Sequence, residues 1–172
     1  MTTQIHGRNW LDNESAQWWI VNDTVMGGRS QSELLKSREQ GFIRFMGNLS
    51  LQNNGGFAST RSLTEQNFFG NTDKICLEVR GDGRAYQLRL RSNRNFDGYA
   101  YVKQFQTINK RWIKLSFELS EFEASFRGRT LTGVPQITAK EIRQVGFLLG
   151  DKKPGKFQLD FRYIGNCLST GV

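Results

Sequence analysis

The sequence contains one histidine and two cysteines among 172 residues, and this shortage excludes several classes of enzyme. A serine or cysteine nucleophile needs a fixed histidine within hydrogen-bond distance, whereas His6 lies in an expected N-terminal tail. Two distant cysteines and one histidine do not supply the usual ligand set of a catalytic zinc ion. Nothing singles out the paired carboxylates of a glycosidase. We therefore predict no catalytic residues and no cofactor, and only a calcium ion held by loop oxygens stays open.

Long apolar runs are also missing. No segment approaches the roughly 20 apolar residues of a membrane span. The first residues, "MTTQIHGRNWLDNES", lack the apolar stretch of a secretion signal. These features predict a cytoplasmic protein, or an organellar one if a targeting peptide precedes this sequence. Without a secretion signal, Cys76 and Cys167 are expected to be two reduced thiols.

Proline is as scarce as cysteine, with two residues, whereas glycine is frequent, with 18, and this contrast favours many tight turns. The formal net charge is +8, so an anionic partner has to be considered. A positively charged surface that is merely solvated is the alternative.

Alternation of apolar and polar residues dominates the rest of the chain, and it predicts eight to ten β-strands. In "KICLEVRGDGRAYQLRLRS", two alternating runs flank Asp-Gly, which is a strong hairpin signal. "VGFLLG" is typical of a strand buried on both faces. Ser/Thr-x-x-Glu patterns at 120–123 and 138–141 predict one short helical turn each. We predict an all-β jelly-roll sandwich, with one domain over 10–166 and tails at 1–9 and 167–172.

Several stretches carry a family resemblance when they are taken in order: "WWIVNDTVMGGRSQS", "FMGNLSLQNNGGFASTR", "LEVRGDGRAYQLRLR", "RWIKLSFELSEFEASFRGR" and "IRQVGFLLGDKKPGKFQLDFRYI". From about Trp18 to Ile164 the chain closely resembles the complex I intermediate-associated proteins of the thirty-kilodalton class. The resemblance implies a galactose-binding-like jelly roll. It also implies a non-enzymatic assembly factor or chaperone for a respiratory or photosynthetic membrane complex, with a protein subunit or assembly intermediate as partner.

Two glycine-rich loops within these stretches are candidate ligand or partner loops. One interpretation is recognition, with charge from Asp23 and Arg29 and an adaptable apolar contact from Met26. The other is structural, with positive φ at the glycines and side-chain caps from Asn22 and Asp23, and it is favoured. The candidate loop residues are Asp23, Met26, Gly27, Gly28, Arg29, Asn54, Gly55 and Gly56.

Arginines concentrate around the expected 74–91 hairpin. Tyr86, Leu88 and Leu90 are expected in the core, so the alternate residues must face away from it. Such a basic, aromatic-edged face fits an acidic peptide, another anionic ligand or RNA. A carbohydrate-binding role is a further alternative, and a solvated face with arginine stems lying over it is another. The candidate binding residues are Arg80, Arg84, Gln87, Arg89, Arg91, Tyr99 and Tyr101.

Overall fold

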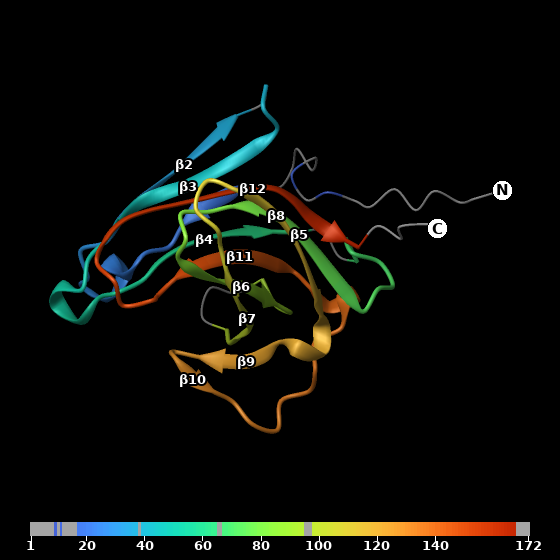
Figure 1. The fold of residues 1–172 in the computed structure, drawn as a ribbon. Helices are drawn as coiled ribbons and strands as arrows, with labels where there is room; N and C mark the ends of the chain where they lie inside the picture. The colour runs from blue at the N-terminus through green and yellow to red at the C-terminus, as the bar shows by residue number, and fades with distance from the viewer. Residues whose placement is uncertain are drawn as a thin grey trace.

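The fold is two stacked antiparallel β-sheets, seen in a computed structural model that describes residues 9, 11, 17–37, 39–64, 67–94 and 98–167 (Figure 1). The larger sheet has seven strands in the order β1-β4-β11-β6-β7-β9-β10, and the smaller has five in the order β2-β3-β12-β5-β8. The strands are β1 (Trp18–Ile20), β2 (Gln31–Ser37), β3 (Phe42–Leu49), β4 (Ala58–Leu63), β5 (Lys74–Arg80), β6 (Ala85–Arg91), β7 (Ala100–Gln106), β8 (Trp112–Glu118), β9 (Glu123–Phe126), β10 (Arg129–Thr130), β11 (Gln144–Leu149) and β12 (Gly155–Asn166). The predicted β-sandwich is confirmed.

Helical structure in the described part is limited to short 3-10 turns. Those at Leu119–Glu121 and Ala139–Glu141 overlap the two turns predicted from capping patterns. The first is closed by Glu118 and Glu121 rather than by Ser120. None of the helical turns in the described ranges is long or apolar enough to cross a bilayer.

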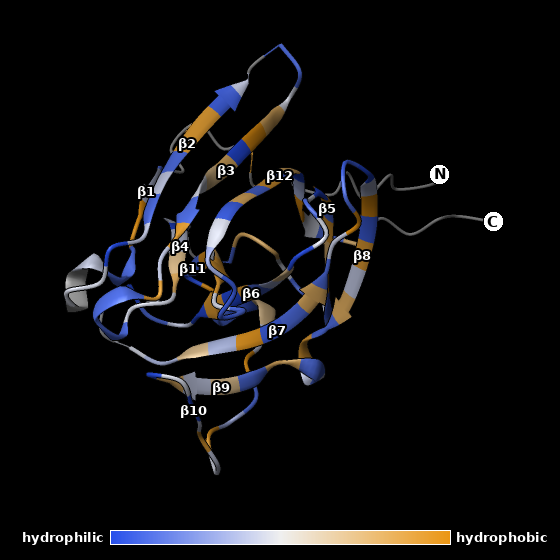
Figure 2. Cartoon of the chain, turned by 60° about the vertical axis from the view of Figure 1, so that its left-hand side comes forward, coloured by the Kyte–Doolittle hydropathy of each residue, from blue (hydrophilic) through white to orange (hydrophobic). Residues whose placement is uncertain are grey.

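The hydrophobic core fills the space between the two sheets. Alternate residues of every long strand point into it, which produces the banding of polar and apolar residues along the strands in Figure 2. Phe45 and Leu159 from the smaller sheet and Leu88 and Phe147 from the larger one are fully buried. As predicted, five of the six residues of β11 are buried.

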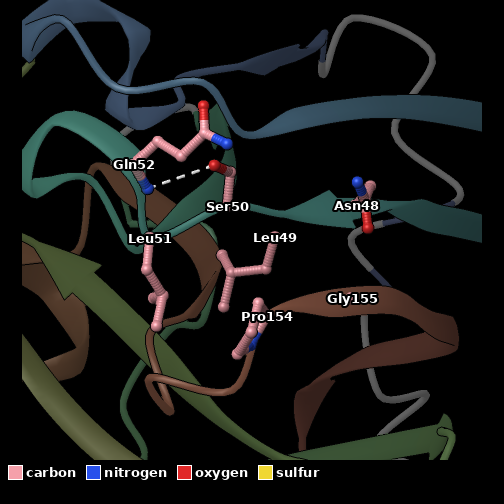
Figure 3. A pocket seen from close by; sticks show the side chains of 7 residues that line it. All are labelled: Asn48, Leu49, Ser50, Leu51, Gln52, Pro154 and Gly155. Atoms are coloured by element: carbon pink, nitrogen blue, oxygen red, sulfur yellow. Dashed lines mark hydrogen bonds between the residues drawn. The ribbon is translucent and has the colours of Figure 1, made fainter.

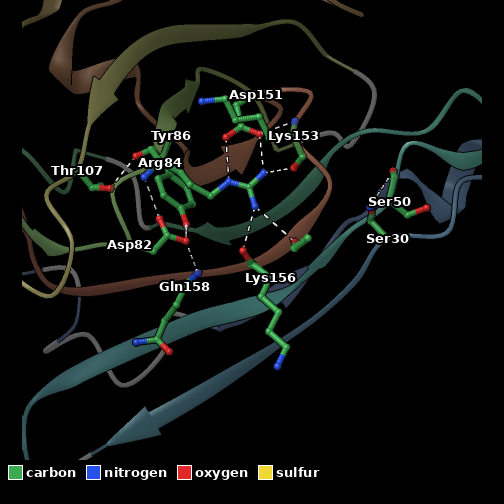
Figure 4. Close-up of polar contacts among 11 residues, drawn as sticks. Ser30, Ser50, Asp82, Arg84, Tyr86, Thr107, Asp151, Lys153, Lys156 and Gln158 are labelled. Carbon is green, nitrogen blue, oxygen red and sulfur yellow. Dashed lines mark hydrogen bonds and ion pairs between the residues drawn. The ribbon is translucent and has the colours of Figure 1, made fainter.

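The predicted hairpin between β5 and β6 is wrong. β5 pairs with β12 and β8 in the smaller sheet, whereas β6 pairs with β11 and β7 in the larger sheet. The Gly-Asp-Gly segment therefore carries the chain from one sheet to the other. Asp82 stabilises this crossing because its carboxylate accepts hydrogen bonds from the Arg84 amide (3.0 Å), the Tyr86 hydroxyl (2.9 Å) and the Gln158 amide (2.8 Å) (Figure 4).

The prediction of two reduced thiols is also wrong, because Cys76 and Cys167 form a disulfide. Cys76 lies in β5, and Cys167 directly follows β12, the strand that pairs with β5. This pairing brings the two Cα atoms to 4.9 Å, within the range that a disulfide spans. Disulfides persist in oxidising compartments, so the cysteines do not support a cytoplasmic location.

Candidate functional site

The outer face of the seven-stranded sheet carries the polar residues that strand alternation predicted for β6. Arg89 lies between Gly146 of β11 and Val102 of β7, and Gly146 in turn pairs with Arg61 of β4. Trp19 of β1 pairs with Arg61 at the end of the same row. We call this surface the arginine face, and it consists of Trp19, Arg61, Gln87, Arg89, Arg91, Gln104 and Gln144.

Gly146 is what lets the backbone and side chains of β4 approach at the centre of this row. A Cβ atom placed there would lie 2.5 Å from the carbonyl oxygen of Thr60 and 3.1 Å from Cβ of Arg61. A larger residue is thus excluded between Arg61 and Arg89, so no side chain from β11 separates these two positions.

The arginines of this face are buried to an unusual degree for charged residues. Arg61 and Arg91 are only 8% and 7% exposed, and Arg89 is half-buried. Burial and, to a lesser extent, the charge of Arg61 together lower the pKa of Arg89 to about 10. Burial likewise lowers the pKa of Arg91 to about 9, with contributions from Arg61 and Arg89. Arg89 and Arg91 therefore stay charged at neutral pH, and both are repelled by the charge of Arg61.

The hydrogen bonds of Arg89 and Arg91 to the described residues do not use all of their buried donors. One Nη of Arg89 donates to Oε1 of Gln87 at 2.8 Å. The Nε atoms of Arg89 and Arg91 are buried without an acceptor among the described residues. In the ion pairs formed between described residues, the cations are Arg44, Arg80, Arg84, Lys103 and Arg162.

Four residues predicted to share this face lie elsewhere. Arg80 is on the outer face of the other sheet, where it and Arg44 both pair with buried Asp160. The hydroxyl of Tyr101, whose side chain is on the core side, donates to the carbonyl of Pro135, and Tyr99 packs edge-on against the Tyr101 ring. The assignment of these residues to one groove with Arg89 is therefore corrected.

Arg84 is the fourth residue that lies away from the arginine face, and its contacts indicate a structural role. Its guanidinium donates to both carboxylate oxygens of Asp151, at 2.9 and 2.6 Å, and to the carbonyls of Lys153, Gly155 and Lys156 (Figure 4). These bonds fasten the start of β6 to the connection between β11 and β12. Hydrogen bonding to Asp151 raises the pKa of Arg84.

The first glycine-rich loop is organised by Asp23, which is fully buried. Its carboxylate accepts hydrogen bonds from the Ser30 amide (3.0 Å), the Ser30 hydroxyl (2.6 Å), the Gly56 amide (2.8 Å) and the Phe57 amide (3.3 Å). Burial acts to raise the pKa of Asp23, but these hydrogen bonds together hold the pKa below its usual value. One carboxylate thus joins the loop after β1 to the loop before β4, far apart in sequence.

The glycines in these loops leave room for that carboxylate. A Cβ on Gly28 would lie 2.4 Å from Cγ of Asp23, and one on Gly55 would lie 2.6 Å from its Oδ2. Gly27 and Gly56 instead have φ of 87° and 133°. The expected positive φ is therefore present at Gly27 but not at Gly28, whose role is steric. These contacts favour the structural interpretation of the Asp23 loop.

Two other candidate loop residues, Arg29 and Asn54, are exposed. Asn54 has φ of 57°. The side chain of Met26 lies outside the described part of the structure.

Beside these loops is a shallow depression of about 530 Å³ between residues 48–52 and Pro154–Gly155, with Leu51 41% exposed at its edge (Figure 3). In the described residues, no group of three His, Cys, Asp or Glu side chains is placed to hold a metal ion.

The sandwich belongs to the class of β-sandwich folds found in carbohydrate-binding modules. The family 11 module of the cellulase Lic26A-Cel5E from Clostridium thermocellum aligns with a TM-score of 0.60 and 12% identity, over 91% of this chain and 94% of that one. The same module in complex with a β-1,3-1,4-mixed-linked tetrasaccharide aligns with a TM-score of 0.59 and 14% identity, over 94% of each chain. At these identities the likeness concerns the fold alone.

Sequence comparison identifies the family. Residues 8–161 match the complex I intermediate-associated protein 30 (CIA30) family, and the chain belongs to it. The mitochondrial complex I intermediate-associated protein 30 of Mus musculus is 25% identical over 87% of this chain and 51% of its own length. A probable mitochondrial counterpart from Caenorhabditis briggsae is 26% identical over 80% and 46%. The chain therefore spans about half the length of these curated relatives, and the predicted family resemblance is confirmed.

Proposed function

We propose that this chain is a non-catalytic binding domain that assists the assembly of a respiratory membrane complex by holding a protein partner on the arginine face. Membership in a family named for its association with complex I intermediates supports the assembly role. The observation that carries the location is that Arg89 and Arg91 have buried Nε atoms without an acceptor among the described residues. Residues 10–166 form the binding domain in this proposal, and the names of the relatives favour an organellar location.

A protein partner fits the chemistry of this face better than a sugar. Arginine is enriched at the centres of protein interfaces, where it contributes strongly to affinity. A sugar site would require aromatic rings exposed across the face, whereas strand pairing brings Trp19 to its β1 end and arginines and glutamines to its middle. The cation-rich centre therefore favours an acidic segment of the partner.

The assembly role can be tested in the organism that carries the gene. We expect deletion to reduce the amount of assembled NADH:ubiquinone oxidoreductase on native gels, and wild-type protein to restore it. Arg89→Gln should restore less, whereas Arg129→Gln, which removes an exposed charge from β10, should restore it fully. Both purified variants should melt within a few degrees of wild type. Normal amounts of the complex in the deletion strain would contradict the proposed function.

A further inference from the structure

We infer that Arg89 and Arg91, which lie on the arginine face near Arg61, form a binding site for one compact oxyanion, a carboxylate or a phosphate group. The site itself follows from the geometry of the arginine face. The identification of the group as part of a protein partner, carried on an acidic or a phosphorylated side chain, rests on the proposed function.

Strand register brings the three arginines together from two strands. Arg61 on β4 and Arg89 on β6 occupy the positions on either side of Gly146, which has no side chain. Arg91 lies two residues further along β6, beside Gln144. The charge of Arg61 lowers the pKa of both Arg89 and Arg91, which means that the three guanidinium groups are close enough to affect one another. The positive charge of Arg61 would therefore add to the attraction between an anion and the guanidinium groups of Arg89 and Arg91.

The hydrogen-bonding capacity of the cluster is unfilled where it is most buried. Arg91 is 7% exposed, and its Nε has no acceptor among the described residues. Nε of Arg89 is also buried without an acceptor among the described residues, while one Nη of the same guanidinium donates a hydrogen bond to Gln87. A buried donor without an acceptor is unfavourable, so an oxyanion would gain both charge attraction and hydrogen bonds here.

Arg84 shows how the same protein treats a buried arginine that has a structural role. Its side chain is 13% exposed, it meets Asp151 with two hydrogen bonds, and three backbone carbonyls complete its shell. Arg91 is more buried as a residue than Arg84, yet the described residues offer it no carboxylate. We expect the ligand to supply to Nε of Arg91 the kind of acceptor that Asp151 supplies to Nε of Arg84 and that the described residues do not offer to Arg91.

Exposure along the face limits the size of that group. It decreases from Gln104, which is exposed, through half-buried Gln87 and Arg89 to buried Arg91. A single carboxylate or phosphate on a flexible stem can reach such a position, and guanidinium groups bind both in a bidentate manner. The continuous phosphate backbone of a nucleic acid is too bulky to approach Arg91 closely.

Titration of the purified domain with sodium phosphate, and separately with sodium acetate, tests the site. At constant ionic strength set with sodium chloride, we expect the NMR signals of the Arg89 and Arg91 Nε–H groups to shift and saturate. The Nε–H signal of exposed Arg129 should stay unchanged, and the melting temperature should rise by several degrees. Stronger binding of acetate would indicate an acidic side chain as the natural group, and stronger binding of phosphate a phosphorylated one.

Variants separate a binding role from a structural one. Without oxyanion, Arg91→Gln should melt at the wild-type temperature or above it, because the substitution removes a buried charge that Arg61 and Arg89 repel. The affinity of this variant for the better oxyanion should fall at least about tenfold, and Arg89→Gln should show the same loss. Arg129→Gln should bind like wild type.

The inference is overturned if neither oxyanion moves the two Nε–H signals. It is also overturned if Arg91→Gln lowers the melting temperature as strongly as Arg84→Gln does, since Arg91 would then be structural. Failure of the assembly experiment alone would refute the proposed function and leave this binding result standing.

Discussion

Replacement of Asp23 by asparagine tests the structural role of the first glycine-rich loop. In the native protein, Oδ2 accepts three hydrogen bonds, from Gly56, Phe57 and the Ser30 hydroxyl, and Oδ1 accepts one from the Ser30 amide. An asparagine can place its single oxygen at the Oδ2 position. Its NH₂ group then faces the Ser30 amide, so two donors meet in a buried site.

The expected loss in stability follows from this count. One hydrogen bond to a charged group is lost, worth about 1.5–3 kcal/mol, and the three that remain are weakened because the acceptor is now neutral. We expect the free energy of unfolding to decrease by about 3 kcal/mol. In a domain of 172 residues, this corresponds to a decrease in melting temperature of about 6–12 °C.

Thermal and urea denaturation of the two proteins, followed by circular dichroism, measures the effect. Asp73→Asn is the matched control. Asp73 is exposed, so this substitution should change the melting temperature by less than about 2 °C. The pKa of Asp23 is lower in the folded protein than in the unfolded chain, so its stabilisation is present above the unfolded pKa. It is lost as the pH falls through the folded pKa, and Asp23→Asn should lack this acid-dependent loss. An Asp23→Asn variant as stable as the control would refute the structural role of the loop.

Three further changes test other parts of the fold by the same denaturation assays. Asp160→Asn should cost about 3 kcal/mol, because it leaves two arginines without their shared buried carboxylate; a loss below about 1 kcal/mol would mean that solvent screens the pair. Cys167→Ser should cost about 2–5 kcal/mol, since the disulfide joins positions 91 residues apart, and a reducing agent should reproduce this in wild type but not in the variant. Gly28→Ala should destabilise more than Gly27→Ala, whose cost of about 1 kcal/mol comes from positive φ without a steric clash; the reverse order would contradict the packing of Asp23 against Gly28.

The sequence was sufficient to predict the class of fold because period-2 alternation depends only on which face of a strand is buried. The same property explains the failure at the 74–91 segment. Alternation shows that Leu77 and Leu88 both face a core, but it does not show whether their strands are neighbours in one sheet or opposite each other in two. A short Asp-Gly turn is compatible with either arrangement, and only contacts distant in sequence decide between them.

The candidate site was predictable to a similar extent. The outward direction of Arg89 and Arg91 followed from their alternation with core residues, and the structure places both on the outer face. Arg61 was missed because its strand joins theirs through β11, more than 50 residues away from either strand. Tyr101 was misplaced because its own strand phase was not determined, and the register opposite Leu90 places it on the core side. The disulfide was missed for the same reason, since strand pairing alone brings Cys167 beside Cys76.

The ends of the seven-stranded sheet have a consequence for how the protein behaves at high concentration. Its outermost strands, β1 and β10, contain three and two residues. An edge that short presents very few unpaired backbone amides and carbonyls to another molecule, and Arg129 in β10 adds a charge there. A long open edge would instead recruit further strands into a growing sheet. We therefore expect this sheet to resist amyloid-like polymerisation, so that associations through it are made by side chains on its outer face rather than by strand addition at its two ends.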